Sequence, residues 1–198
     1  KTGDLTFPEL SEMLPSQKID NYMFENLDGQ NFSKSNKKWG ISFEGFSNGA
    51  AYADLDNDGD LELVVNNIDS MASIFKNLSS ENGVGNYLKV KLEGPDKNPL
   101  GIGAKVYVTC GDNTHMREQF LVRGYESSID PVIHFGLSSA DNIDKIAIDW
   151  PNGKRTELTQ IDPNQMITVN ASNAIDYKVD QAINHKIFEP TLSTGLEE

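Results

Sequence analysis

The chain has 198 residues, enough for one large domain or two small ones with a hydrophobic core. Its formal net charge of −13 disfavours nucleic acid and anionic membranes as partners, because both are recognised through clustered Lys and Arg. The single Cys110 excludes an internal disulfide framework and a cysteine-rich zinc site, and no apolar run approaches the roughly 20 residues of a transmembrane helix.

Two segments of the first 80 residues share one pattern. Residues 23–27 read Met-Phe-Glu-Asn-Leu, and residues 74–78 read Ile-Phe-Lys-Asn-Leu. Each copy is typical of a short strand that runs into a polar turn, and repeats of about 40–50 residues are typical of propeller blades. A closed propeller needs roughly four to eight blades, so we expect this chain to be part of a longer multidomain protein. A short helix is expected over Glu9–Met13.

Between the two copies the sequence predicts a strand, an acidic loop and a second strand. The segment Gly49–Asp54 is rich in small residues, as in strands whose neighbours approach closely. The segment Leu61–Val65 is a nearly continuous apolar run, which suits a buried strand.

From Asn86 onward, apolar and polar residues alternate in short segments. Short strands at this spacing, without long helical periodicity, favour an antiparallel sandwich or barrel. Pro151-Asn152-Gly153 is a strong turn signal that predicts a hairpin. A short helix is expected over Val179–Phe188. The expected strands cover Leu88–Leu92, Val106–Val108, Phe120–Val122, Ile146–Trp150, Arg155–Thr159 and Met166–Val169.

The acidic loop, residues 54–62, reads Asp-Leu-Asp-Asn-Asp-Gly-Asp-Leu-Glu. Oxygen ligands at loop positions 1, 3 and 5, a glycine at 6 and a main-chain carbonyl at 7 are how proteins wrap calcium. An EF-hand also needs a glutamate at position 12, where this chain has Val65, and it needs flanking helices instead of strands. The sequence therefore predicts a strand-flanked Ca²⁺ loop, with calcium favoured over magnesium because the loop offers many protein oxygens.

A solvated acidic turn is the alternative interpretation of this loop. Its carboxylates would repel one another by about 3 kcal/mol per close pair at an effective dielectric constant near 20. A strand junction that carries this repulsion without a cation would be costly, which favours the metal site.

His134, in Ile-His-Phe-Gly-Leu, is the histidine most suggestive of catalysis, because Ser138, Ser139 and Asp141 follow it. Residue types that are close in sequence do not make a catalytic triad, and the chain has no Gly-x-Ser-x-Gly elbow. We expect His134 to be structural, bonded to a backbone group near a strand end.

Several of these segments together resemble two known families. Residues 21–32 resemble the opening of an FG-GAP/VCBS propeller repeat, and residues 47–65 resemble the calcium loop of that family. Residues from about 86 to 171 resemble the ASPIC/UnbV domain. The matching pieces of that domain are Gly-Ile-Gly-Ala-Lys-Val at 101–106, His-Phe-Gly-Leu at 134–137 and Trp-Pro-Asn-Gly at 150–153.

The resemblance implies an extracellular, calcium-stabilised β-protein. In FG-GAP loops the ion is held through positions 1, 3, 5, 7 and 9, and position 7 uses its main-chain carbonyl. Glu62 departs from the aspartate usual at position 9. No catalytic residue is carried over from the ASPIC/UnbV domain. The implied metal ligands in this chain are Asp54, Asp56, Asp58, Asp60 and Glu62.

The sequence therefore predicts an all-β fold, with a partial β-propeller-type repeat segment followed by an antiparallel β-sandwich. The expected divisions are a repeat segment with the calcium loop at 1–82, an ASPIC/UnbV sandwich at 83–172, and a linker or short helix at 173–198. We expect no transmembrane segment.

We expect a non-enzymatic Ca²⁺-binding scaffold or adhesion module that presents loops to a protein or glycan partner. Its location would be secreted or at the cell surface, and periplasmic or outer-membrane in a Gram-negative bacterium. One alternative is a carbohydrate-binding module that uses Trp39, Tyr125 or Trp150, and another is a hydrolase or cyclase that uses His134. An exposed aromatic platform would support the first, and an exposed His134 close to a nucleophile or carboxylate would support the second.

Overall fold

The computed structural model describes residues 6–8, 13 and 17–177. Its regular structure is dominated by β-strands in five sheets, which confirms the all-β fold class. The expected helix at Val179–Phe188 lies outside the described residues, as do residues 9–12 of the expected helix at Glu9–Met13. Within the described part, no helix has the length and apolar character needed to cross a membrane.

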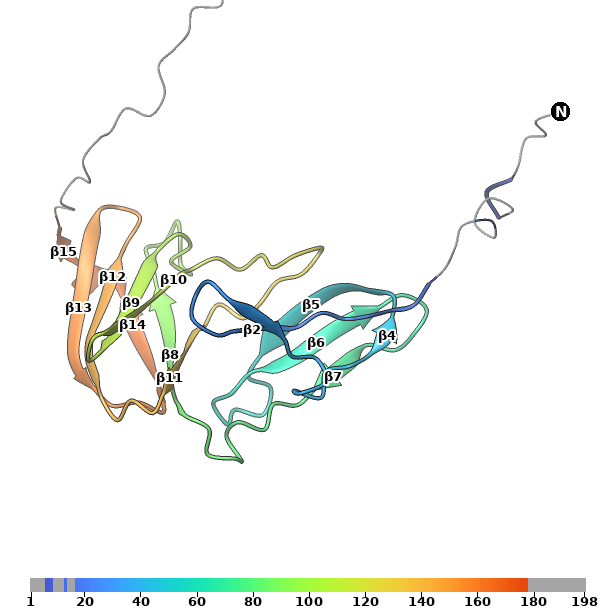
Figure 1. Cartoon of the computed structure of the whole chain (residues 1–198). Helices are drawn as coiled ribbons and strands as arrows, with labels where there is room; N and C mark the ends of the chain where they lie inside the picture. Colours follow the sequence, from blue (N-terminus) through green and yellow to red (C-terminus); the bar gives the residue numbers. More distant parts are fainter. Residues whose placement is uncertain (1–5, 9–12, 14–16, 178–198) are drawn as a thin grey trace, which may run out of the picture.

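The N-terminal region, residues 17–83, contains three small antiparallel sheets (Figure 1). β1 pairs with β4, β2 pairs with β3, and β5, β6 and β7 form a three-stranded sheet in that order. The predicted strand, acidic loop and strand are confirmed as β5, the loop and β6. The strands are β1 (Ile19–Asp20), β2 (Phe24–Asn26), β3 (Phe32–Lys34), β4 (Glu44–Gly45), β5 (Ser47–Ala53), β6 (Glu62–Asn67) and β7 (Ser73–Phe75).

The sandwich, residues 86–176, consists of a five-stranded sheet in the order β10-β9-β12-β13-β15 and a three-stranded sheet in the order β11-β8-β14. A 3-10 turn at Ala171–Asn173 connects β14 to β15. The strands are β8 (Asn86–Glu93), β9 (Lys105–Cys110), β10 (Asn113–Glu118), β11 (Ile133–Ser138), β12 (Ile143–Asp149), β13 (Lys154–Ile161), β14 (Gln165–Asn170) and β15 (Ile175–Asp176).

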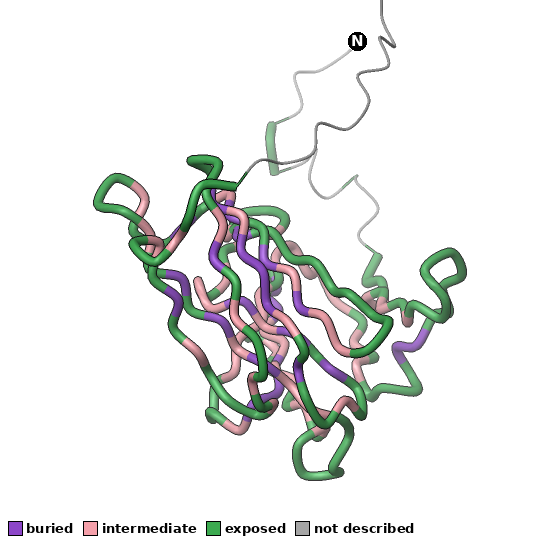
Figure 2. The backbone as a smooth tube through the Cα atoms, turned by 90° about the vertical axis from the view of Figure 1, so that its left-hand side faces the viewer, coloured by how far each residue is buried: buried purple, intermediate pink, exposed green. Residues whose placement is uncertain are grey.

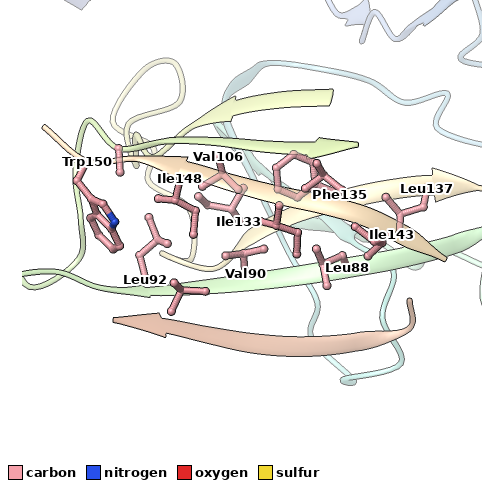
Figure 3. Packing of buried hydrophobic residues seen from close by; sticks show 14 residues of the cluster. Leu88, Val90, Leu92, Val106, Ile133, Phe135, Leu137, Ile143, Ile148 and Trp150 are labelled. Carbon is pink, nitrogen blue, oxygen red and sulfur yellow. The ribbon is translucent and has the colours of Figure 1, made fainter. Parts of the chain in front are cut away.

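The core of the sandwich lies between its two sheets (Figure 3). Leu88, Val90 and Leu92 alternate along β8 and all point inward, as their period of two requires. Phe135 from β11 and Ile148 from β12 pack in the same cluster. Figure 2 shows buried residues following these strands, so the sandwich has one continuous apolar core.

The predicted hairpin after Trp150 is confirmed as the β12–β13 connection. The N–H of Trp150 donates to the carbonyl of Lys154 at 2.9 Å, and Gly153 adopts a φ of +81° in the turn. The indole Nε1 of Trp150 donates to Thr156 Oγ1 at 2.9 Å, which satisfies the polar end of a buried ring.

Three features differ from the sequence-based expectation. A strand was expected at Phe120–Val122, but β10 lies earlier at Asn113–Glu118, and only Val122 forms an isolated bridge, with Ser128. All six residues of β10 are exposed, so the alternation that marks a strand is absent there. β14 pairs with β8 in parallel although the other pairs of the sandwich are antiparallel. β15 adds an edge strand beyond residue 172, where we expected the sandwich to end.

Candidate metal centre

The acidic loop is the connection between β5 and β6, which pair antiparallel up to Ala53 and Glu62. The chain reverses through positive φ angles of 62° at Asn57 and 100° at Gly59. A β-carbon on Gly59 would also collide with the ring of Tyr87 from the sandwich. Glycine is therefore required here both by backbone conformation and by close packing.

Asp54, Asp56 and Asp58 come together as the sequence predicts. One carboxylate oxygen from each lies within 4.8 Å of the other two. The side chain of Asp54 is only 7% exposed, and its Oδ1 is buried without a hydrogen-bond partner. A buried carboxylate oxygen without a donor is costly, and a cation among the three carboxylates would satisfy it. The residues of this loop therefore fit a hard divalent cation.

Asp60 and Glu62 are both buried, but neither belongs to the group of three. Glu62 accepts the N–H of Leu55 at 2.8 Å and that of Asn77 at 3.4 Å. Asp60 accepts the N–H of Ser80 at 2.8 Å through Oδ2, while its Oδ1 is buried without a partner. Through these hydrogen bonds the two side chains hold the loop against residues 77–80, which follow β7.

Asp58, Asp60 and Glu81 form a second acidic group. One carboxylate oxygen from each of them lies within 4.8 Å of the other two. Sequence reasoning missed Glu81, because it lies 21 residues beyond Asp60 and outside the loop motif. Its carboxylate brings a further negative charge to the same side of the loop.

The electrostatics of the loop disfavour additional negative charge. Burial raises the pKa of Asp60, and the nearby Glu62 carboxylate raises it further, against the opposing hydrogen bond from Ser80. For Asp58, the hydrogen bond from the Asp60 N–H lowers the pKa. Desolvation and the carboxylates of Asp60, Asp56 and Glu81 outweigh that bond and leave the pKa raised. A bound cation would reverse both effects, because it favours the ionised form of a carboxylate.

Two lysines that sequence reasoning missed pair with the loop. Lys89 Nζ on β8 lies 2.6 Å from Asp54 Oδ2, and the two side chains are only 15% and 7% exposed. Lys76 Nζ lies 2.9 Å from Asp56 and 2.7 Å from Glu81. The side chains of the Lys76 pairs are more than two-fifths exposed, so we expect these pairs to contribute little. The Lys89 pair is shielded from water and joins the two regions of the molecule.

The tip of the loop rests against the sandwich. His134 Nε2 lies 2.8 Å from the carbonyl oxygen of Gly59, and because a carbonyl only accepts, the imidazole donates. The ring of Tyr87 stacks on His134 at a centroid distance of 5.9 Å and lies under Gly59. β8 and β11 of the sandwich therefore provide the surface on which the acidic loop packs.

This contact confirms the predicted structural hydrogen bond of His134. Burial lowers the pKa of His134, while the bond to Gly59 opposes that shift. Among the described residues, no serine, cysteine or carboxylate is hydrogen-bonded to the His134 ring. Its Nε2 proton is already used to hold the loop.

The three aromatic residues considered for glycan binding have different environments. Trp150 is 4% exposed and belongs to the core, so burial removes it as a binding platform. Trp39 is 44% exposed and Tyr125 is 64% exposed, so both remain accessible to a ligand.

Comparison with known proteins identifies the second half of the chain. Residues 94–176 match the family described as ASPIC and UnbV, so the chain contains an ASPIC/UnbV domain. The chain is also homologous to cartilage acidic protein 1. It is 32% identical over 113 residues to the protein of that name from Xenopus tropicalis, and 33% identical over 115 residues to the one from Homo sapiens.

Each alignment covers 56% of this chain but only 17% of the relative. The aligned stretch is longer than the ASPIC/UnbV match, so the similarity extends beyond that domain. The chain thus corresponds to a small part of the much longer relatives that it matches.

Proposed function

We infer that this chain is a non-enzymatic, calcium-binding module of an extracellular scaffold protein. The observation that carries this proposal is the buried, unpartnered Oδ1 of Asp54 beside the carboxylates of Asp56 and Asp58. A divalent cation supplies the missing partner and offsets the repulsion among the three groups.

Calcium fits these residues better than magnesium. Asp54, Asp56 and Asp58 offer oxygen ligands from three carboxylates of one loop, whereas magnesium usually keeps several waters and takes one or two carboxylates. The resemblance to FG-GAP loops adds Asp60, through its carbonyl, and Glu62. We propose that Glu62 acts mainly as a brace, because its carboxylate already accepts the N–H groups of Leu55 and Asn77.

The N-terminal region supports an FG-GAP/VCBS type of repeat. The two copies of the repeated pentapeptide provide β2 and β7, each a three-residue strand, and the acidic loop lies between them in the sequence. The order of strand, calcium loop and strand is the one that the resemblance implies.

The position of the loop supports a structural role for the cation. Asp54 is tied to Lys89, and Gly59 is tied to His134 and packs on Tyr87. A cation that fixes the loop would also fix the surface by which the N-terminal region contacts the sandwich. The N-terminal region and the sandwich would then form one rigid unit. Such a unit is suited to present its loops to a protein or glycan at the cell surface or in the matrix.

The extracellular assignment draws on the net charge of −13 and on homology to a protein named for cartilage. Calcium loops of micromolar to millimolar affinity are filled where calcium is abundant, as it is outside cells. The alternative of a hydrolase that uses His134 is disfavoured by the hydrogen bond of that ring to Gly59.

Isothermal titration of the purified chain with CaCl₂ tests the proposal. We expect one Ca²⁺ per chain, at least about tenfold weaker binding in Asp58→Asn, and unchanged binding in Asp112→Asn. Asp112 is an exposed aspartate in the β9–β10 turn. Its substitution removes the same charge as Asp58→Asn, but away from the acidic loop. Absence of calcium-dependent heat and of any shift in melting temperature at millimolar calcium would refute the metal site.

A further inference from the structure

A long connection in the sandwich extends away from it as an arm, residues 119–132, which joins β10 to β11. In Figure 1 this connection leaves the sandwich and reaches toward β5. The arm is a narrow hairpin, because main-chain hydrogen bonds connect its two sides. The N–H of Arg123 donates to the carbonyl of Ser127 at 2.9 Å, and the N–H of Ile129 donates to the carbonyl of Leu121 at 3.0 Å. At its base the buried Gln119 donates to the carbonyl of Pro131 at 2.6 Å.

The tip of the arm lies against β5 of the N-terminal region. A β-carbon on Gly49 would lie 3.0 Å from the carbonyl oxygen of Tyr125 and 2.9 Å from Ser127 Oγ. Arg123 Nε lies 3.4 Å from the hydroxyl oxygen of Tyr52. The arm therefore makes a second contact between the two regions, separate from the acidic loop.

A cavity of about 370 Å³ lies between the arm tip, β5, β6 and the segment before β2. This volume is within the range of small-molecule sites, roughly 300–1,000 Å³. Its lining includes the apolar side chains of Met23, Ile41, Leu63 and Val65. Tyr22 and Tyr125 also line it, and they are 63% and 64% exposed.

Two polar groups of the cavity have unused hydrogen-bonding capacity. The Nδ2 of Asn21 is buried without a partner. The guanidinium of Arg123 donates to the Tyr52 hydroxyl and to the carbonyl of Val122, but within the described residues no carboxylate forms an ion pair with it. These two bonds use two of the five N–H donors of the guanidinium, so donors remain for an acidic ligand.

We propose that this cavity binds a single acidic sugar unit, such as a uronate at the end of a glycan. The carboxylate would pair with the planar fork of Arg123, and a ring hydroxyl would accept a hydrogen bond from Asn21 Nδ2 once that buried amide turns toward the cavity. The apolar C–H face of the sugar would lie against the exposed ring of Tyr125. This inference deepens the proposed function by naming its partner, and it rests on that function only for the presenting role.

The charge of the site selects among anionic ligands. One guanidinium matches one carboxylate, whereas a phosphate ester or a sulfated chain would bring more negative charge to a strongly acidic protein. A simple aliphatic acid would pair with Arg123 but would leave Asn21 unsatisfied. A terminal uronate brings a carboxylate for Arg123 and ring hydroxyls for Asn21 in one ligand.

The test is a titration of the ¹⁵N-labelled chain, with saturating calcium, followed by NMR. The probes are D-glucuronate, D-glucose, which keeps the ring without the carboxylate, and propionate, which keeps the carboxylate without the ring. We expect saturable shifts at the amides of residues 48–50 and 123–125 with glucuronate, at a dissociation constant of about 1 mM for a ligand of this size. Glucose and propionate should each bind at least about tenfold more weakly.

Variants locate the site. Arg123→Met should weaken glucuronate binding about tenfold or more, as hydrogen bonds to a charged group predict. Arg117→Met removes the same charge from the exposed strand β10 and should leave binding unchanged. Tyr125→Ala removes an exposed ring that folding does not need and should weaken binding about 2- to 10-fold.

Several outcomes would overturn the sugar site. These are equal binding of glucose, equal binding of propionate, equal losses in Arg117→Met and Arg123→Met, or no saturable shift up to about 50 mM, well above the expected constant. Calcium binding by the same sample separates the two proposals, since a sample that binds calcium but not glucuronate refutes only the sugar site. Glucuronate-dependent shifts centred on residues 54–62 instead of residues 48–50 and 123–125 would place the sugar on the acidic loop and also refute the cavity.

Discussion

The sandwich and the N-terminal region are both built from short strands, but they bury different kinds of side chain. Fourteen buried hydrophobic residues form one cluster in the sandwich. Within residues 17–83, Val65 is the only buried hydrophobic residue, and the others buried there are Ser35, Asn36, Gly59, Asp60, Glu62 and Asn67. Apolar burial can stabilise the first region by itself, whereas the second depends on hydrogen bonds, on the loop and on its contacts with the sandwich.

In the interior of the N-terminal region, side-chain hydrogen bonds take the place of an apolar core. Asn36 Oδ1 accepts the N–H of Met23 at 2.9 Å, which ties the segment before β2 to the turn after β3. Asn67 Nδ2 donates to the carbonyl of Met71 at 2.9 Å and to Ser73 Oγ at 3.0 Å. Such bonds are directional and contribute about 1 kcal/mol each. They therefore fix the geometry of the region more than they add to its unfolding free energy.

Truncation of one phenylalanine ring in each region would give the largest contrast. Phe135→Ala removes a ring that is 2% exposed in the core of the sandwich, and we expect a loss of about 3–5 kcal/mol in unfolding free energy. Phe32→Ala removes a ring that is 60% exposed on β3, and we expect a change within about 0.5 kcal/mol. Urea denaturation of both variants measures the difference, and equal losses would show that the N-terminal region has an apolar core after all.

Removal of calcium should affect the two regions unequally. A ligand that binds only the folded state adds about 2.7 kcal/mol at a hundredfold excess over its dissociation constant. Chelation should therefore speed amide hydrogen exchange in residues 50–66 much more than in β9 and β12, which the apolar core protects. Uniformly faster exchange across the sandwich would mean that the cation stabilises the whole chain, and unchanged exchange everywhere would contradict the metal site.

Local patterns in the sequence were sufficient for most strands and for the group Asp54, Asp56 and Asp58. The alternation along β8 and the turn after Trp150 each determine their element within a few residues. β10 was missed because Asn113–Glu118 is exposed on all positions, and its pairing with β9 depends on backbone bonds that no side-chain pattern reports. The parallel pairing of β14 with β8 is equally invisible, since period two does not specify direction.

The partners of the acidic loop were not predictable from local sequence. Lys89 lies 35 residues from Asp54, and His134 lies 75 residues from Gly59. Both contacts depend on how the sandwich packs against the N-terminal region, which is a property of the tertiary structure. The one available signal was a histidine expected near a strand end, in a chain without a nucleophile elbow, which indicated a structural bond but not its acceptor.

The bond between His134 and Gly59 can be tested as a link between the two regions. His134→Gln should lower the unfolding free energy by about 1–3 kcal/mol, because it removes the imidazole that donates to the Gly59 carbonyl and stacks on Tyr87. His115→Gln changes an exposed histidine on β10 and should have almost no effect. Differential scanning calorimetry compares the two variants. If both melt like the wild-type chain, the bond does not hold the regions together.

The smallest expected effect is a pH dependence of the unfolding free energy that comes from the imidazole of His134. Burial lowers the pKa of His134 below its ordinary value of 6.5, so the folded state disfavours the protonated form. As the pH falls through 6.5, the unfolded chain takes up a proton at this position before the folded chain does. The folded state therefore loses stability relative to the unfolded state as the pH decreases, and keeps the full contribution of His134 above that range.

This dependence is isolated by comparing variants, because the other titratable groups are the same in both chains. The unfolding free energy of the wild-type chain minus that of His134→Gln should decrease from pH 7.5 to pH 5.5, at saturating calcium. The same difference calculated with His115→Gln should stay nearly flat, because that ring is exposed on β10, away from the contact with Gly59. A difference that grows as the pH falls would mean that the protonated ring is the form held against Gly59. In that case the charge of Asp54, which favours protonation, would outweigh the desolvation of the imidazole.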